Sequence, residues 1–305
     1  MNHHLRRRLA ESITALECGD ISVLSAFDSP SLSHIIGLTG SPGVGKSCLT
    51  SALVTELRAR GRTVAVIAID PSSPTTGGSL LGDRLRMGKH RSDAAVYIRS
   101  IASRGHLGGA SSSTPLVLSL LERAGFDTIL VETVGVGQSE TEIRHLADTM
   151  VWMTAPGLGD DIQAAKAGVL EVADVLVVNK SDLQGADETA EQLRSALHQA
   201  PAVGAGQWQP EVVCTSAVDE SGVSEFLDVL DRHLAAEGAD ARRAMREKRF
   251  GQVLVELSLD QLRERILTAA KPDGRPLVEC IVNRLARGEM ELGDAVAHVV
   301  EAVTR

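Results

Sequence analysis

The stretch of sequence that decides the fold runs Ile35-Ile36-Gly37-Leu38-Thr39-Gly40-Ser41-Pro42-Gly43-Val44-Gly45-Lys46-Ser47. Its first five residues form a compact apolar run, which predicts a buried β-strand. The next eight match the pattern GxxxxGK[ST]. Leu49, Leu53 and Leu57 then recur every fourth residue up to Gly61, which predicts an amphipathic helix with a glycine cap. A strand, a glycine-rich loop and a helix in this order are the context that a phosphate loop requires.

The residue types in this loop suit the binding of a nucleoside triphosphate. Glycines let the backbone wrap around an anion, so that successive N–H groups and the helix N-terminus point at the phosphates. Lys46 is expected to span the β- and γ-phosphates and to act in catalysis, and the Ser47 hydroxyl is expected to coordinate Mg²⁺. Residues Gly40 to Ser47 are therefore predicted to bind nucleotide. The alternative interpretation is a glycine-rich turn that binds none.

A second motif, Asn179-Lys180-Ser181-Asp182, follows a buried apolar run and predicts which base is bound. The Asp182 carboxylate can accept hydrogen bonds from N1–H and the 2-amino group of guanine. Adenine lacks that amino group and would leave the carboxylate unpaired, at a cost of some kcal/mol. Asn179 and Lys180 are expected to brace the base and the phosphate loop. A further loop after the last predicted strand resembles the segment whose backbone N–H contacts the guanine oxygen, and its predicted nucleotide contacts are Ser216, Ala217 and Val218.

Acidic residues beside the phosphate loop are candidate ligands for Mg²⁺ or for its water molecules, because carboxylate oxygens are hard ligands. Asp70 and Glu132 each end a predicted strand, and Asp83 lies in a glycine-rich segment. Asp83 and Glu132 are also candidate catalytic residues, although each of the three acids could equally be a helix cap or a turn former. Gln138, in the glycine-containing loop after Glu132, is a candidate for orienting the attacking water, or else a polar loop residue.

The rest of the chain predicts an α/β fold with a doubly wound, mostly parallel sheet. Apolar runs that read as strands alternate with helical patterns, so right-handed crossovers should place ligands beyond the carboxyl ends of the strands. After about residue 239 the sequence becomes charged and helical. The predicted organisation is an N-terminal helical segment at residues 1–33, a nucleotide-binding domain at 34–237 and a C-terminal helical arm at 238–305. The predicted strands are Ile35–Thr39, Thr63–Ile69, Ala95–Ser100, Thr128–Val131, Met150–Thr154, Val175–Val178 and Val212–Thr215.

Composition narrows the class of protein. A net charge of −9 gives no electrostatic reason to expect a nucleic acid or an anionic membrane as the main partner. The four cysteines are far apart and the nine histidines are scattered, so the sequence indicates neither a disulfide framework nor a metal store. No apolar run follows the arginines at positions 6 to 8, and nowhere do eighteen consecutive apolar residues occur, so neither a signal peptide nor a membrane span is expected and a cytoplasmic location is predicted.

Several segments, taken together and in order, resemble one known family. The chain is similar to the metallochaperone-type P-loop GTPases and, within them, to the methylmalonyl-CoA mutase-associated chaperones of the MeaB/ArgK type, over about residues 34 to 235. The segments that carry the resemblance are Ala68-Ile69-Asp70-Pro71-Ser72-Ser73, the Gly77–Asp83 stretch, Arg104-Gly105-His106-Leu107-Gly108-Gly109, Glu132-Thr133-Val134-Gly135-Val136-Gly137-Gln138-Ser139-Glu140 and the Asn-Lys-Ser-Asp motif.

The resemblance implies GTP hydrolysis that protects an adenosylcobalamin-dependent acyl-CoA mutase and gates its cofactor loading. It also implies a homodimer joined through the C-terminal arm, a metal-site role for Glu132, and switch positions at Asp70 and Asp83. Two departures from the family stand out. The region before Ile35 is short, and Cys48 replaces the usual threonine, where its backbone N–H is expected to meet the α-phosphate of GTP or GDP.

Other functions remain open on the sequence. One is a nickel- or zinc-delivery GTPase of the same broader class, although such proteins usually carry His-rich or Cys-rich tracts. Another is an ATP-dependent kinase, and a third is a binding module in which nucleotide only holds the fold. We see no arginine that the motifs place as a catalytic finger, so slow hydrolysis by the free protein and acceleration by a partner are expected.

Overall fold

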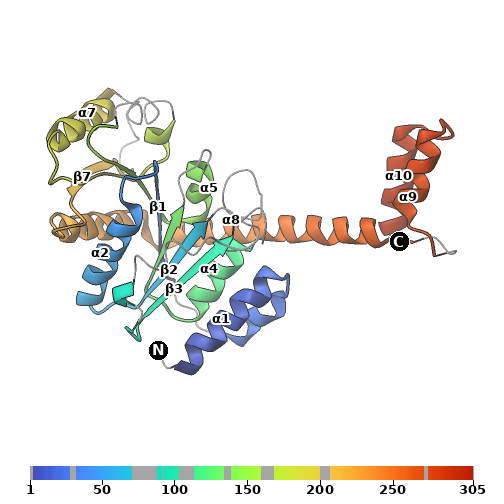
Figure 1. The fold of residues 1–305 in the computed structure, drawn as a ribbon, viewed down its shortest axis with the longest axis horizontal. Helices are drawn as coiled ribbons and strands as arrows, with labels where there is room; N and C mark the ends of the chain where they lie inside the picture. The colour runs from blue at the N-terminus through green and yellow to red at the C-terminus, as the bar shows by residue number, and fades with distance from the viewer. Residues whose placement is uncertain are drawn as a thin grey trace. The chain divides into compact units, whose positions relative to one another are not determined.

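A seven-stranded, fully parallel β-sheet forms the centre of the fold in a computed structural model of the chain (Figure 1). The structure describes residues 3–27, 32–70, 88–90, 92–102, 113–133, 139–158, 168–199, 207–270 and 274–304. The strand order is β3-β2-β4-β1-β5-β6-β7. All seven predicted strands are confirmed. They could be predicted because each is a mostly apolar, β-branched run bounded by turn residues. The strands are β1 (His34–Gly40), β2 (Val64–Asp70), β3 (Val96–Ala102), β4 (Thr128–Thr133), β5 (Thr149–Thr154), β6 (Val175–Asn179) and β7 (Glu211–Thr215).

Helices cover both faces of this sheet. Apolar side chains of β1 alternate between the faces, so that Ile36 and Leu38 pack in one core with α2 (Lys46–Ala59) and the start of α8 (Val223–Thr268). The opposite face is covered by α4, α5 and α7, and α1 lies beside α4 (Figure 1). At Gly37 an added Cβ would lie 2.6 Å from Ile143 Cγ2, so helix α5 packs directly on the β1 backbone. The remaining helical elements of this part of the chain are α1 (His3–Glu17), η1 (Ile21–Ala26), η2 (Gly88–His90), α4 (Thr114–Arg123), α5 (Ser139–Leu146), η3 (Val169–Glu171) and α7 (Ala186–Gln199).

Strand β1 is the point from which the sheet is wound in two directions. It pairs in parallel with β4 on one side and with β5 on the other, with Leu38 opposite Glu132 and Gly40 opposite Met153. The carboxyl ends of β1, β4, β6 and β7 therefore lie along one edge of the sheet, where doubly wound folds bind ligands. This arrangement places the loop after β1 next to the residues that end β4 and β6.

A buried polar network lies at the opposite edge of the sheet, where the strands β1 and β5 begin. His34 Nε2 lies 2.7 Å from Thr149 Oγ1, which lies 2.8 Å from Nδ1 of His233 on α8. Burial lowers the pKa of His34 to about 3, and the nearby charge of Arg242 acts in the same direction. His34 is therefore neutral in the folded protein at physiological pH. Two other groups near this edge, the buried carboxyls of Glu122 and Asp148, have pKa values raised by desolvation.

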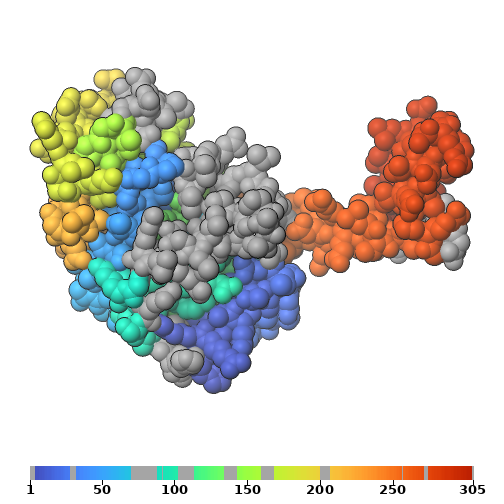
Figure 2. Space-filling view, in the orientation of Figure 1, coloured from blue at the N-terminus to red at the C-terminus, as the bar shows by residue number. Residues whose placement is uncertain are grey.

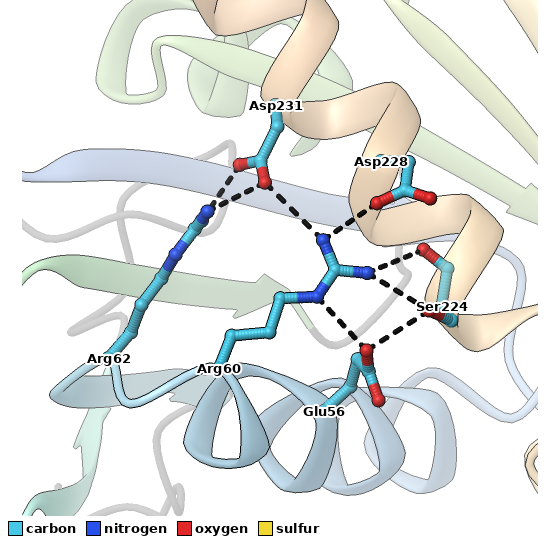
Figure 3. Close-up of polar contacts among 6 residues, drawn as sticks. All are labelled: Glu56, Arg60, Arg62, Ser224, Asp228 and Asp231. Carbon is cyan, nitrogen blue, oxygen red and sulfur yellow. Dashed lines mark hydrogen bonds and ion pairs between the residues drawn. The ribbon is translucent and has the colours of Figure 1, made fainter.

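Helix α8 is fastened to the end of α2 by a network of charged groups (Figure 3). Arg62 donates to both carboxylate oxygens of Asp231, at 2.7 and 2.6 Å, and Arg60 lies 2.7 Å from Asp228 and 3.6 Å from Asp231. A bidentate arginine–carboxylate pair is geometrically specific as well as charge-assisted. The helix that starts in the phosphate loop is thus tied at its other end to α8.

The chain forms two compact units, Met1–Arg249 and Phe250–Arg305, with the division inside α8. The charged sequence after about residue 239, predicted to be helical, continues as helix up to Thr268, where α8 ends. Gly251 is not among the residues with positive φ, so it does not end the helix, whereas Gly238 departs from helical geometry with φ 72° and ψ 171°. The domain boundary at residue 237 stays a prediction. The second unit also contains α9 (Leu277–Ala286) and α10 (Leu292–Thr304), which pack through Leu277, Ile281 and Ala295.

None of the helices in the described part of the chain is both long enough and apolar enough to cross a membrane.

Candidate functional site

The loop between β1 and α2 has a backbone that requires glycine at several positions. Gly40, Gly43 and Gly45 have φ values of 143°, 84° and 94°. A Cβ at Gly40 would lie 2.2 Å from the Met153 carbonyl oxygen, and one at Gly45 would lie 2.5 Å from Asn179 Nδ2. Such close approaches exclude a side chain, so glycine is needed here for space as well as for conformation. The loop has the strand–loop–helix setting that the sequence predicted.

Lysine and serine at the start of α2 are both held in place by the residues around them. Lys46 is buried, and its Nζ donates to the carbonyl oxygens of Gly40 at 2.7 Å and Ser41 at 3.1 Å. Its positive charge therefore lies over the loop that would surround a phosphate. Ser47 Oγ donates to Glu132 Oε1 at 2.5 Å. The phosphate loop and the end of β4 thus meet, as the two motifs together predicted.

The Glu132 carboxylate lies at the end of β4 and is 3% exposed. Besides the Ser47 hydroxyl, it accepts from Thr50 Oγ1, which lies 3.2 Å from Oε2. A hydroxyl oxygen beside a carboxylate is a hard donor set that suits Mg²⁺, an ion usually held by one or two carboxylates together with substrate phosphates and water. Among the described residues no group of three or more His, Cys, Asp and Glu side chains is arranged to hold a metal ion.

The Asn-Lys-Ser-Asp motif contacts the phosphate loop directly. Asn179 ends β6 and donates from Nδ2 to the carbonyl oxygen of Val44 at 2.8 Å. Lys180, with a positive φ of 60°, donates from Nζ to the carbonyl oxygen of Gly43 at 2.7 Å. Asp182 is exposed and makes no hydrogen bond to another described residue, so its carboxylate is available to a base. The residues expected to brace the loop are therefore in contact with it.

A third segment, residues 215–218, joins this arrangement from the end of β7. Thr215 Oγ1 donates to Asn179 Oδ1 at 3.2 Å, so the Asn179 amide bridges two loops. Ser216 is buried and Val218 is 87% exposed, with Ala217 between them in exposure. The space-filling view shows the blue segment of the phosphate loop at the surface beside green and yellow segments of the first unit (Figure 2).

Three predicted site residues lie wholly or partly outside the described residues. Asp83 and Gln138 are not described, and of Asp70 the structure describes the backbone, at the end of β2. Their proposed roles in metal binding and catalysis stay predictions. Cys48 is exposed in the first turn of α2, and its thiol is free.

Two residues that position this site were missed by sequence reasoning. Thr50 contacts Glu132, and its signal was the spacing of three from Ser47, which puts both hydroxyls on one helix face. Gly222 has a φ of 71°, and a Cβ there would lie 2.1 Å from the Cys214 carbonyl oxygen, so it shapes the turn after residues 215–218. Its signal was the polar turn sequence Asp219-Glu220-Ser221-Gly222.

Comparison with known proteins gives a consistent result. The family model described as methylmalonyl-CoA mutase-associated GTPase MeaB matches residues 19–271. A putative GTPase of Pyrococcus horikoshii is 40% identical over 291 residues, which cover 89% of this chain and 91% of that protein. GTPase ArgK of Escherichia coli is 41% identical over 233 residues, covering 75% and 68%. The mitochondrial methylmalonic aciduria type A homolog of Caenorhabditis elegans is 40% identical over 209 residues, covering 67% and 52%.

Solved structures agree on the fold. A crystal structure described as an LAO/AO transport system kinase matches all of this chain and 99% of its own, with a TM-score of 0.60 and 23% identity. HypB from Helicobacter pylori, solved in complex with nickel, covers 76% of this chain and 96% of its own, with a TM-score of 0.51 and 16% identity. At these identities the likeness concerns the fold alone.

Proposed function

Because this chain belongs to the MeaB family of methylmalonyl-CoA mutase-associated GTPases, we propose that it is a cytoplasmic, Mg²⁺-dependent chaperone of an adenosylcobalamin-dependent acyl-CoA mutase. The GTPase activity follows from the family, whose members convert GTP to GDP and phosphate. The chaperone would protect the mutase and gate the loading of its cofactor. The observation that carries the proposal is the match over residues 19–271, which contains the phosphate loop, Glu132 and the base motif.

The binding of GTP is assigned to the residues around the phosphate loop. The backbone N–H groups of residues 40–48 and the Lys46 ammonium would hold the phosphates, since both present positive charge to an anion. Ser47 and Glu132 would hold Mg²⁺, and the bound ion would neutralise negative charge on the phosphates. Asn179 and Lys180 would keep the loop and the base motif together through Val44 and Gly43.

Selection of guanine is assigned to Asp182. Its exposed carboxylate can pair with two donors on the guanine edge, and an alanine there removes both hydrogen bonds. We expect Asp182→Ala to weaken GDP binding by about 100-fold and to abolish the preference for guanine over adenine nucleotides, because bonds to a charged group contribute roughly 1.5–3 kcal/mol. Titration of fluorescent GDP and ADP measures both effects. Substitution of the neighbouring exposed residue, Leu183→Ala, serves as the control, and an unchanged preference in D182A would contradict the assignment.

Dimerisation is assigned to the C-terminal arm, residues 238–305. In α8, Val255, Leu259 and Leu262 follow one another at spacings of four and three and are exposed, which makes an apolar stripe on one side of the helix. Helix α10 carries a similar row of exposed residues, at Leu292, Val296 and Val300. Exposed apolar surface of this regularity is typical of a protein interface. A second copy of the chain is the partner that we propose for it.

The mutase role is tested by steady-state GTP hydrolysis with and without a purified methylmalonyl-CoA mutase-type enzyme. Slow turnover of the free protein and acceleration by the mutase are expected, because efficient phosphoryl transfer needs a further positive group or a reordered loop. Lys46→Ala is the control, since it should remove hydrolysis in both conditions. Equal rates with and without the mutase would contradict the chaperone proposal, and a submicromolar response to nickel would favour metal delivery instead.

A further inference from the structure

Thr50 is a completely buried hydroxyl one helical turn beyond Ser47 on α2. Its Oγ1 lies 2.9 Å from the Lys46 carbonyl oxygen and 3.2 Å from Glu132 Oε2. The first contact is the usual bond of a helical threonine to the carbonyl four residues earlier. The second reaches 82 residues along the chain to the carboxylate at the end of β4.

The same helix offers a comparison. Thr55 donates to the Ser51 carbonyl oxygen at 3.1 Å, so it makes the same backbone bond without a carboxylate partner. Local helix geometry therefore satisfies a threonine hydroxyl by itself. The one hydroxyl proton of Thr50 is shared between the Lys46 carbonyl oxygen, at 2.9 Å, and Glu132 Oε2, at 3.2 Å, as a bifurcated bond. A buried carboxylate is stabilised by each donor that it can accept from.

The two hydroxyls of α2 meet different oxygens of one carboxylate. Ser47 contacts Oε1 at 2.5 Å and Thr50 contacts Oε2 at 3.2 Å. The terminal torsion of a glutamate side chain is broad, so each contact at a carboxylate oxygen narrows the range of planes that the carboxylate adopts. The contact of Thr50 with Oε2 favours the plane in which Oε1 lies beside Ser47.

We propose that Thr50 is a positioning residue for the Mg²⁺ site, which holds Glu132 by Oε2 so that Oε1 stays beside the Ser47 hydroxyl. This inference rests on the proposed Mg²⁺ role of Ser47 and Glu132, and it is independent of the mutase. Thr50 itself touches neither nucleotide nor metal in this assignment. Its effect is to orient an oxygen ligand, and residues that orient metal ligands in this way typically change metal affinity by about 10–100-fold when substituted.

The test compares Thr50→Val, which removes the hydroxyl at nearly constant shape, with Thr50→Ser, which keeps it, and with the matched control Thr55→Val. The readout is the release of fluorescent GDP as Mg²⁺ is titrated, with release in EDTA as the metal-free reference. We expect T50V to raise the Mg²⁺ concentration at the midpoint by about 10-fold, with T50S and T55V close to wild type and release in EDTA unchanged. The Mg²⁺ midpoint of GTP hydrolysis should shift in parallel.

A wild-type Mg²⁺ midpoint in T50V would overturn the inference, as would equal shifts in T50V and T55V, because the effect would then be general to the helix. Faster GDP release in EDTA would also overturn it by indicating a damaged loop. If T50V does not fold, T50S and T50A make the same comparison, since they differ in the hydroxyl alone. A wild-type protein that releases GDP and hydrolyses GTP without regard to Mg²⁺ would instead refute the Mg²⁺ part of the proposed function.

Discussion

Replacement of Gly45 by alanine tests whether the phosphate loop and the base motif are packed as closely as the structure indicates. The φ of 94° costs an alanine about 1–2 kcal/mol. The new Cβ would lie 2.5 Å from Asn179 Nδ2 and must displace that amide from its 2.8 Å bond to the Val44 carbonyl oxygen. Leaving a buried acceptor unpaired costs roughly 1–3 kcal/mol. The expected loss of stability is therefore about 2–5 kcal/mol in total.

Thermal unfolding and titration of fluorescent GDP measure the two consequences. Each kcal/mol should lower Tm by roughly 2–4 °C, and GDP affinity should fall because the displaced Asn179 no longer braces the loop. Gly43→Ala is the matched control, since Gly43 has a φ of 84° and open space where its Cβ would be, so it should bear the conformational cost alone. Equal Tm values and equal GDP affinities for G45A and G43A would refute the steric reasoning.

The remaining predictions concern pH and assembly. The folded pKa of His34, about 3, lies below its unfolded value near 6.5, so the unfolded chain binds the extra proton as pH falls. The part of the free energy of unfolding that depends on His34 is therefore largest above about pH 6.5. It should fall by about 2 kcal/mol by pH 5, as measured by urea unfolding. His34→Gln should remove that loss, and identical pH slopes in the two proteins would argue against it. Leu259→Glu should convert the proposed dimer to a monomer in light scattering, with Glu264→Ala, on the other side of α8, as control, and an unchanged mass would exclude this stripe as the interface.

The sequence predicted the sheet well, because its strands carry two signals at once. Val175–Val178, for example, is an apolar, β-branched run followed by Asn179, and a parallel strand buried on both faces needs such a run. The long helix α8 was harder. Gly238 departs from helical geometry whereas Gly251 does not, and both have open space where a Cβ would lie, so neither the local sequence nor the packing distinguishes the two glycines.

The candidate site, too, could be predicted from the sequence only in part. Motif spacing predicted that Lys46, Ser47 and Glu132 lie together, since each follows or ends a strand at one edge of the sheet. The hydrogen bonds that hold the site together could not be predicted from motif spacing. Asn179 to Val44 and Thr50 to Glu132 join segments that are 135 and 82 residues apart, and each depends on the distance between two packed elements.

The contrast between Asp182 and its neighbours bears on how such a protein can change during evolution. Asn179 and Lys180 are committed to the scaffold through Val44 and Gly43, so substitution there disturbs the nucleotide pocket as a whole. Asp182 supports nothing else among the described residues. Under the proposed assignment of guanine selection to Asp182, nucleobase preference is therefore a modular trait: a single substitution changes it and leaves intact the residues assigned to phosphate binding and hydrolysis.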